Sequence, residues 1–146
     1  MRQCEDGRVT DDAYLLRPIG RVESSLVDRH DAPRQGDEGA PDAWLVFDPA
    51  VREGLRDLSA GGEVLLLTWL HQADRDTLVV HPRGNVSRPE TGVFSTRAPS
   101  RPNPIGLHRV GIIAVDGERI HVRDLEAVDG TPILDVKPVL DPGRER

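Results

Sequence analysis

The stretch GVFSTRAPSRPNPIGL, Gly92 to Leu107, limits how this chain can fold more than any other part of it. It holds prolines at positions 99, 102 and 104, and each proline fixes the backbone angle φ and removes a hydrogen-bond donor. The residue before each proline is pushed toward extended conformations. No helix can run through this stretch. We therefore expect a stiff, largely extended loop that presents Arg97, Arg101 and Asn103, in which Gly106 allows a neighbouring group to approach the backbone closely.

The segments on either side of this loop are short and rich in β-forming residues. A helix is expected only after Asp48-Pro49, where Asp is a good N-cap and Pro suits the first helical position, and Gly61-Gly62 ends it. The hairpin signal is Asp116-Gly117. The predicted strands run over residues 14–22, 43–47, 63–70, 76–81, 109–115, 118–125 and 133–140. The apolar run EVLLLTWL, 63–70, predicts a strand that is buried on both faces.

This pattern predicts a mostly β fold, either an antiparallel β-barrel or a sandwich, with one short helix. There is no G-x-G-x-x-G motif after a strand, no P-loop and no repeated βαβ unit, which argues against a Rossmann fold. With 146 residues the chain fits one domain, which we place at 14–140 between a flexible leader (1–13) and a tail (141–146).

Composition predicts a soluble cytoplasmic protein. Cys4 is the only cysteine, so an internal disulfide is impossible, and no apolar run approaches the length of a membrane span. The formal net charge is -6, but five arginines and a single acid between Arg83 and Arg109 make that window +4 and leave -10 for the remainder. These arginines either bind a carboxylate or phosphate, or pair with acids elsewhere on the fold.

Polar groups stand at three further places that suit a binding site. Pro33-Arg34-Gln35 lies in a constrained polar loop, and His71-Gln72 follows the apolar strand. Asp124, Glu126 and Asp129 lie near a turn, where they serve as a general base, as a counter-charge for a cation, or simply as a solvated acidic turn. The five histidines show no metal-ligand spacing, so no metal site is expected.

Five motifs in order resemble the TsaA-like family, the TrmO type of S-adenosylmethionine-dependent methyltransferase. They are PIGRVES (18–24), PRQ (33–35), HQ (71–72), the central loop, and VDGTPILDVKP (128–138). The resemblance covers residues 17–140. It implies a small β-barrel that dimerises, binds the methyl donor near the dimer interface, and methylates the N6 nitrogen of threonylcarbamoyladenosine beside a tRNA anticodon.

The resemblance also implies which residues contact the donor. Those positions are Pro33, Arg34, Gln35, His71, Gln72, Arg97, Leu107, Arg123, Asp124, Leu125 and Glu126. For catalysis, Asp129 or Asp124 is expected to take the proton of the acceptor nitrogen, with Arg101 and Asn103 orienting the acceptor.

Three alternatives stay open at this point. The same barrel could methylate a small molecule. It could bind S-adenosylmethionine without catalysis, or it could be an interaction module whose arginine loop faces an acidic partner.

Overall fold

A computed structural model describes residues 12–27, 32–33 and 39–140 of the chain, which form eight strands and three 3-10 helices. In chain order these are β1 (Gly20–Glu23), β2 (Ala43–Phe47), η2 (Pro49–Leu55), β3 (Glu63–Trp69), β4 (Val79–Val80), η3 (Pro82–Gly84), β5 (Thr91–Gly92), η4 (Val93–Ser95), β6 (Ile105–Asp116), β7 (Arg119–Arg123) and β8 (Pro132–Pro138).

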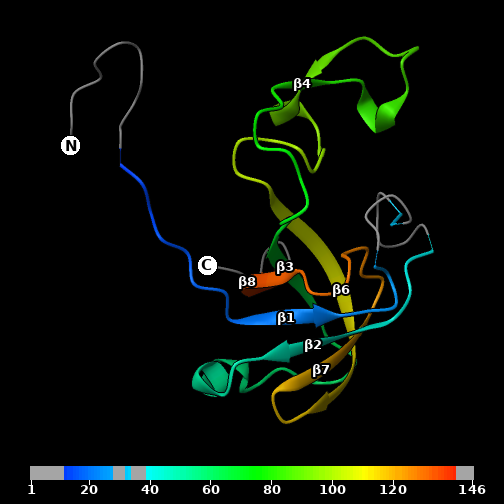
Figure 1. Ribbon diagram of the computed structural model, residues 1–146. Coiled ribbons are helices and arrows are strands. Elements are labelled where there is room, and N and C mark those ends of the chain that lie inside the picture. The colour runs from blue at the N-terminus through cyan, green and yellow to red at the C-terminus, as the bar shows by residue number, and fades with distance from the viewer. Residues whose placement is uncertain (1–11, 28–31, 34–38, 141–146) are drawn as a thin grey trace.

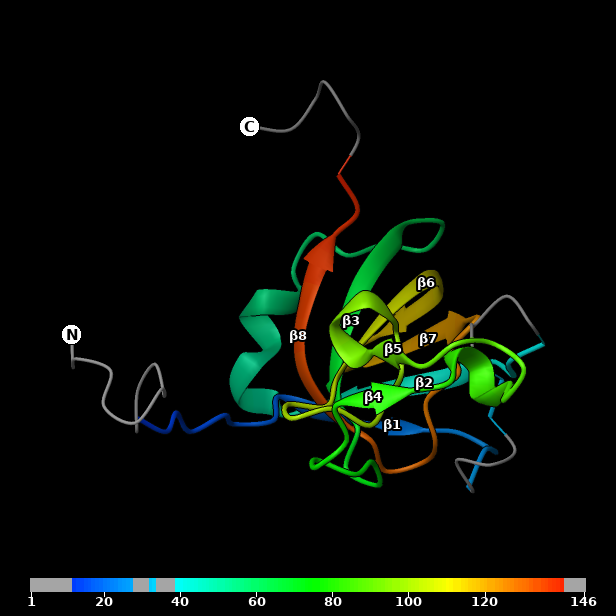
Figure 2. The same ribbon diagram turned by 90° about the horizontal axis from the view of Figure 1, so that it is seen from above.

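Six strands form one antiparallel sheet in the order β1-β2-β7-β6-β3-β8. The sheet closes into a barrel because β8 pairs back onto β1, with Gly20 opposite Ile133 and Arg21 opposite Pro132 (Figures 1 and 2). On its other side β1 packs closely against β2, since a Cβ atom on Gly20 would lie 2.5 Å from the Val46 carbonyl oxygen. The predicted mostly β, non-Rossmann fold class is confirmed.

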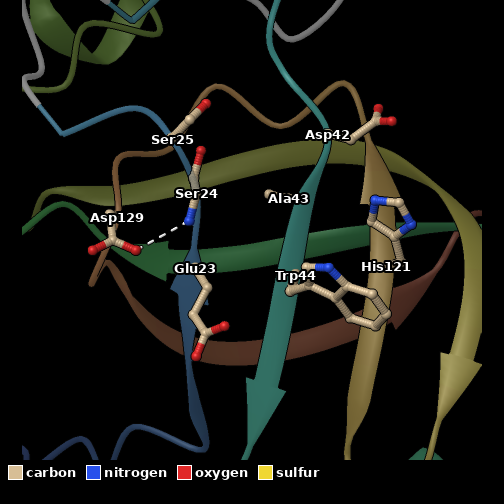
Figure 3. A pocket seen from close by; sticks show the side chains of 8 residues that line it. All are labelled: Glu23, Ser24, Ser25, Asp42, Ala43, Trp44, His121 and Asp129. Carbon is tan, nitrogen blue, oxygen red and sulfur yellow. Dashed lines mark hydrogen bonds between the residues drawn. The ribbon is translucent and has the colours of Figure 1, made fainter.

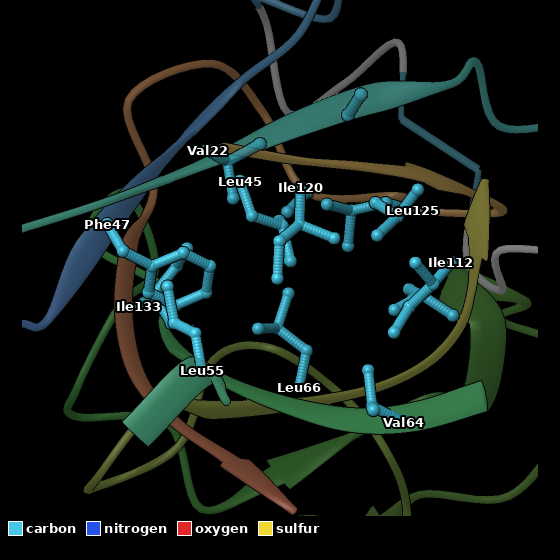
Figure 4. Packing of buried hydrophobic residues seen from close by; sticks show 14 residues of the cluster. Val22, Leu45, Phe47, Leu55, Val64, Leu66, Ile112, Ile120, Leu125 and Ile133 are labelled. Atoms are coloured by element: carbon cyan, nitrogen blue, oxygen red, sulfur yellow. The ribbon is translucent and has the colours of Figure 1, made fainter. Parts of the chain in front are cut away.

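The core fills the inside of the closed sheet (Figure 4). Strand β3 alternates strictly: Val64, Leu66 and Thr68 point inward and are buried, whereas Leu65 and Leu67 are half-buried on the outer face. The prediction that this strand is buried on both faces is therefore wrong. A run of leucines cannot reveal the period-2 alternation that a closed antiparallel sheet imposes.

The predicted helix after Asp48 begins where expected but is a 3-10 helix. Asp48 Oδ1 accepts a hydrogen bond from the Ala50 amide at 2.9 Å, and the Val51 amide donates to the Asp48 carbonyl in the i to i+3 pattern. Leu55 packs into the core from this helix (Figure 4). This segment has only seven residues and covers one end of the barrel. Regular α-helical hydrogen bonding would add little stability to so short a segment.

The strands predicted over 14–22 and 76–81 are much shorter than expected. The first was predicted from Tyr14 but begins at Gly20, because Pro18 cannot donate to a ladder and the residues before it are exposed. The strand predicted over 76–81 is reduced to β4, which pairs only with the two-residue β5. Together, β4 and β5 form a small separate sheet.

Consecutive connections of the closed antiparallel sheet alternate between its two ends. The connections β1 to β2, β3 to β6, and β7 to β8 therefore share one end, which we call the upper rim: among the described residues 24–27, 32–33, 39–42, 70–104 and 124–131. The segment 70–104 rises from this rim as an arm that carries β4 and β5, while η2 and the β6–β7 hairpin lie at the opposite end (Figure 1). Among the described residues there is no helix long and apolar enough to span a membrane.

Candidate functional site

The described residues that were predicted for ligand binding lie at or near the upper rim. His71 and Gln72 begin the arm, Arg97 lies within it, and the segment 123–126 leaves β7 toward the same end. Leu107 lies near the rim end of β6. Pro33 is half-buried in the first rim connection, while Arg34 and Gln35 lie outside the described residues. Residues that are far apart in sequence thus belong to connections at one end of the barrel.

The rim presents groups of different chemistry to solvent. His71 and Arg97 are exposed, and Leu107 is 41% exposed on the outer face of β6. Glu126 is mostly covered, with a side chain 17% accessible. A cation, a carboxylate and an apolar side chain at one end of the barrel suit a ligand that combines a carboxylate, hydroxyl groups and an apolar body.

Beneath the rim, three polar side chains form a hydrogen-bonded chain inside the barrel. The Thr68 hydroxyl lies 2.7 Å from His108 Nε2, and His108 Nδ1 lies 2.5 Å from Glu126 Oε1. Thr68 is 0% and His108 4% exposed. Buried polar groups of this kind are costly unless they are paired, and here both ring nitrogens have partners.

Gly106 makes this arrangement possible. A Cβ atom there would lie 2.5 Å from Thr68 Oγ1 and 2.7 Å from His108 Nε2, too close for any side chain. The expectation that Gly106 permits a close approach to the backbone is confirmed, and the approaching groups are these two polar side chains.

The segment after β7 is held rigidly at the rim. Asp124 adopts a left-handed conformation with φ 66°, which turns the chain so that Leu125, Ala127 and Val128 are buried beneath it. Thr131 Oγ1 donates to the Val128 carbonyl at 2.7 Å. Asp124 itself lies 3.7 Å from the Arg123 guanidinium. Glu126 therefore starts from a fixed backbone position.

Asp129 lies in a shallow hollow at the rim side of β1, β2 and β7 (Figure 3). Its Oδ1 accepts a hydrogen bond from the Ser24 amide at 3.0 Å. In the same hollow the rings of Trp44 and His121 stack with centroids 4.7 Å apart. Asp129 and Asp124, the two predicted bases, thus belong to one rim segment but have different surroundings.

Arg101 and Asn103 have architectural contacts within the arm. Arg101 Nη2 donates to the carbonyls of Val93 and Thr96, at 2.8 Å for Thr96, and so closes the turn that contains η4. Asn103 Oδ1 accepts from Arg75 Nη2 at 3.1 Å.

Arg75 also ties the base of the arm to the barrel. Its Nε donates to the Pro102 carbonyl at 2.8 Å, and its guanidinium lies 5.1 Å from the centre of the Trp69 ring. Trp69, Arg75 and Asn103 line a second hollow of about 340 Å³ on the rim side of β3 and β8.

Some arginines of the window 83–109 make contacts within the fold, and others are exposed to solvent. Arg109 binds Glu63 with both nitrogens of its fork, and these hydrogen bonds and the positive charge lower the pKa of the Glu63 carboxyl. Arg101 is used inside the arm, as described above. Arg88 and Arg97 are exposed, and no ion pair to either is found in the part of the chain that the structure describes. The interpretation that these arginines pair with acids therefore holds for Arg109, whereas binding of a carboxylate or phosphate stays a prediction for Arg88 and Arg97.

Sequence reasoning missed Thr68 and His108 as site residues. Gly106, His108 and Val110 share the inward face of β6, and this alternation could have identified His108 as a buried residue. The predicted strand began only at Arg109, so His108 was left outside it. No group of three or more potential metal ligands occurs among residues 12–27, 32–33 and 39–140.

Comparison with known proteins identifies the family. Residues 21–142 match the model of the tRNA-methyltransferase O N-terminal domain. The chain belongs to this family. The resemblance inferred from the five sequence motifs is confirmed.

Two curated relatives of this TrmO-family chain span almost the same length. A probable S-adenosyl-L-methionine-binding protein of Methanothermobacter thermautotrophicus is 41% identical over 130 residues, covering 89% of this chain and 93% of that protein. An S-adenosyl-L-methionine-binding protein of Archaeoglobus fulgidus is 44% identical over 124 residues, covering 84% and 87%.

Solved TrmO structures share the fold but are longer. One TrmO crystal structure has a TM-score of 0.74 at 30% identity, and TrmO from Pseudomonas aeruginosa has 0.71 at 30%; each match covers 91% of this chain. The chain spans only 60% and 58% of the length of those two proteins.

The contacts of Arg101 generate a test of the arm in this TrmO-family protein. Arg88 and Arg101 are each followed by proline, which blocks trypsin, so Arg97-Ala98 is the cleavable bond of this part of the arm. Replacing Arg101 by Met leaves the two carbonyls without their donor, and we expect cleavage after Arg97 to accelerate about tenfold. Cleavage is followed by mass spectrometry, with R88M as the matched control; equal rates in both variants would contradict the clamp.

Proposed function

We propose that this protein is an S-adenosylmethionine-dependent N-methyltransferase, and that its acceptor is the N6 nitrogen of threonylcarbamoyladenosine next to the anticodon of a tRNA. The observation that carries the proposal is that His71, Gln72, Arg97 and the segment 123–126, all predicted donor contacts, lie at the upper rim, where Arg97 and Glu126 offer matching chemistry for the donor. Membership of a methyltransferase family and S-adenosylmethionine-binding relatives support it.

The residues present fit the donor. Arg97 is an exposed guanidinium suited to the methionine carboxylate, because its planar fork binds a carboxylate through two hydrogen bonds. Glu126 offers a carboxylate to ribose hydroxyls, and the backbone of Asp124 and Leu125 offers donors and acceptors to the adenine edge. His71, Gln72, Arg123 and the segment 33–35 complete the expected contacts.

When bound, S-adenosylmethionine supplies an electrophilic methyl carbon. What this chain must add is positioning of the acceptor nitrogen in line with that carbon, exclusion of water, and removal of one proton from the nitrogen. A nitrogen that carries a carbamoyl group is a weak nucleophile, so proton removal is the demanding part of the task.

Asp129 is the better placed of the two predicted bases. Asp124 lies 3.7 Å from the Arg123 guanidinium, so its carboxylate is already engaged in an ion pair. Asp129 has one oxygen held by the Ser24 amide, which fixes its orientation, and it faces the open hollow that contains Trp44 and His121. We assign Asp129 as the group that takes the proton.

The arm supplies groups suited to a polyanionic acceptor. Arg88 and Arg97 are exposed on it, at the same end of the barrel as the donor residues. The hollow formed by Trp69, Arg75 and Asn103 offers an aromatic ring, a cation and an amide, which suit a nucleobase and phosphate. A tRNA loop fits this combination better than an uncharged small molecule does. The chemistry takes place in the cytoplasm, where tRNA is modified.

A second copy of the chain is expected to cover the apolar side chains of the arm. Phe94 and Val86 are each 81% exposed, and Leu78 is 61% exposed. Apolar residues gathered on a projecting arm are typical of a protein interface. Multi-angle light scattering should give the mass of a dimer for the wild type and of a monomer for F94D; a monomeric wild type would contradict the dimer.

Replacing Arg97 by Ala should weaken donor binding without affecting the fold. The variant removes the proposed partner of the methionine carboxylate, so we expect the dissociation constant of S-adenosylmethionine to rise about tenfold or more. Calorimetry measures it, with R88A as the matched control because Arg88 is also an exposed arginine of the arm. Unchanged binding by R97A would rule out this role.

The function itself is tested by incubating the purified protein with isotope-labelled S-adenosylmethionine and total tRNA from a strain that lacks any homologue. We expect the label on threonylcarbamoyladenosine after nucleoside mass spectrometry. Label in a metabolite extract but not in tRNA would identify a small-molecule acceptor. Donor binding with no labelled product in either sample would instead identify a non-catalytic binding protein.

The proton acceptor is tested in the same assay. D129N keeps an oxygen for the Ser24 amide but removes the basic carboxylate, so kcat should fall by about 100-fold or more at unchanged donor affinity. D124N is the matched control, because Asn adopts the left-handed conformation of Asp124 without strain. If D124N loses activity and D129N keeps it, the assignment must be reversed.

A further inference from the structure

The hydrogen-bonded chain under the rim leads from the barrel core to a predicted donor contact. It begins at Thr68, passes through both nitrogens of His108, and ends at Glu126. Its first two members are buried and have no access to a ligand, whereas the Glu126 side chain is 17% exposed at the rim. Of these three hydrogen-bonded side chains, a ligand at the rim can therefore contact only Glu126.

The partners fix the direction of the hydrogen bonds. A carboxylate oxygen only accepts, so His108 Nδ1 carries the proton and donates to Glu126 Oε1. In the neutral imidazole Nε2 is then the acceptor for the Thr68 hydroxyl. The ring cannot rotate without losing both bonds, and Gly106 keeps its backbone close beside Thr68 and the ring. The carboxylate of Glu126 is thereby held in one orientation.

The backbone of Glu126 is equally constrained, since Leu125 and Ala127 on either side are buried. One carboxylate oxygen, Oε1, is occupied by His108, and Oε2 has no partner among the described residues. The Glu126 side chain is held at its backbone and at one carboxylate oxygen. Such a side chain loses little conformational entropy when it binds a ligand, which raises its contribution to affinity.

We propose that His108 and Thr68 are positioning residues, which hold the Glu126 carboxylate to accept hydrogen bonds from the vicinal ribose hydroxyls of the methyl donor. The inference rests on the proposed function, because it concerns the donor of that reaction. Neither His108 nor Thr68 touches the donor. They act by keeping Glu126 oriented, in the way that partners of a ligating side chain tune other binding sites.

Two replacements of His108 distinguish its hydrogen bond to Glu126 from its hydrogen bond to Thr68. In H108N the amide nitrogen takes the place of Nδ1, so the bond to Glu126 is kept and the bond to Thr68 is lost. In H108Q the terminal amide reaches the place of Nε2, so the bond to Thr68 is kept and the bond to Glu126 is lost. Each variant leaves one polar group without its hydrogen-bond partner. The destabilisation that an unpaired buried group causes is therefore similar in the two variants, and they can be compared directly.

The readout is the preference for ribose hydroxyls. Calorimetry gives the affinities for S-adenosylhomocysteine and for its 2′,3′-dideoxy counterpart, and their ratio isolates the contacts made by the two hydroxyls. We expect the wild type to prefer the ribose form at least about tenfold. H108N should keep most of this ratio, and H108Q should lose it. A purely structural role would lower both affinities together and leave the ratio unchanged.

A measurement on the wild type covers the case in which a variant does not fold. In ¹⁵N NMR spectra the His108 Nδ1 proton should shift when S-adenosylhomocysteine is added and move much less with the dideoxy compound. An unchanged ratio in H108Q, equal binding of both compounds by the wild type, or an unmoved Nδ1 signal would each overturn the inference while leaving donor binding intact. If neither compound binds the wild type, the proposed function fails as well.

Discussion

The pairing of β1 with β8 is the constraint on which the rest of the structure depends. It closes the sheet, and the antiparallel pairing of all six strands places alternate connections at one end. The predicted contacts at 71–72 and 123–126, which are far apart in the chain, therefore belong to one rim. The bond between the Ser24 amide and Asp129, which are 105 positions apart, is a local sign of the same closure.

The rim is supported from inside the barrel at some cost in core hydrophobicity. Three polar side chains are buried among the described residues, Thr68, His108 and Thr131, and each is paired. Two of the pairs end on the segment that bears the predicted donor contacts: His108 binds Glu126, and Thr131 binds the carbonyl of Val128. Apolar side chains at these positions would avoid the cost of burying polar groups. The presence of the polar groups therefore indicates that a fixed rim matters more than maximal stability.

Much of this fold follows from local sequence rules, while the buried polar chain does not. The Asp116-Gly117 turn, the N-cap at Asp48 and the barrier to a continuous helix through the proline loop were all predictable, because each depends on neighbouring residues; the short helix η4 at the start of that loop was not predicted. The 3-10 form of η2 and the one-sided burial of β3 were not, since both are set by packing across the barrel. His108 escaped notice because its partners lie 40 and 18 positions away.

Binding of the methyl donor at the upper rim can be tested by titrating ¹⁵N-labelled protein with S-adenosylmethionine and following the backbone amides. We expect shifts concentrated in residues 70–73, around Arg97, at 107–108 and in 124–131, with the opposite end of the barrel, residues 48–62 and 116–118, unaffected. Shifts centred on that opposite end, or none at all, would contradict it.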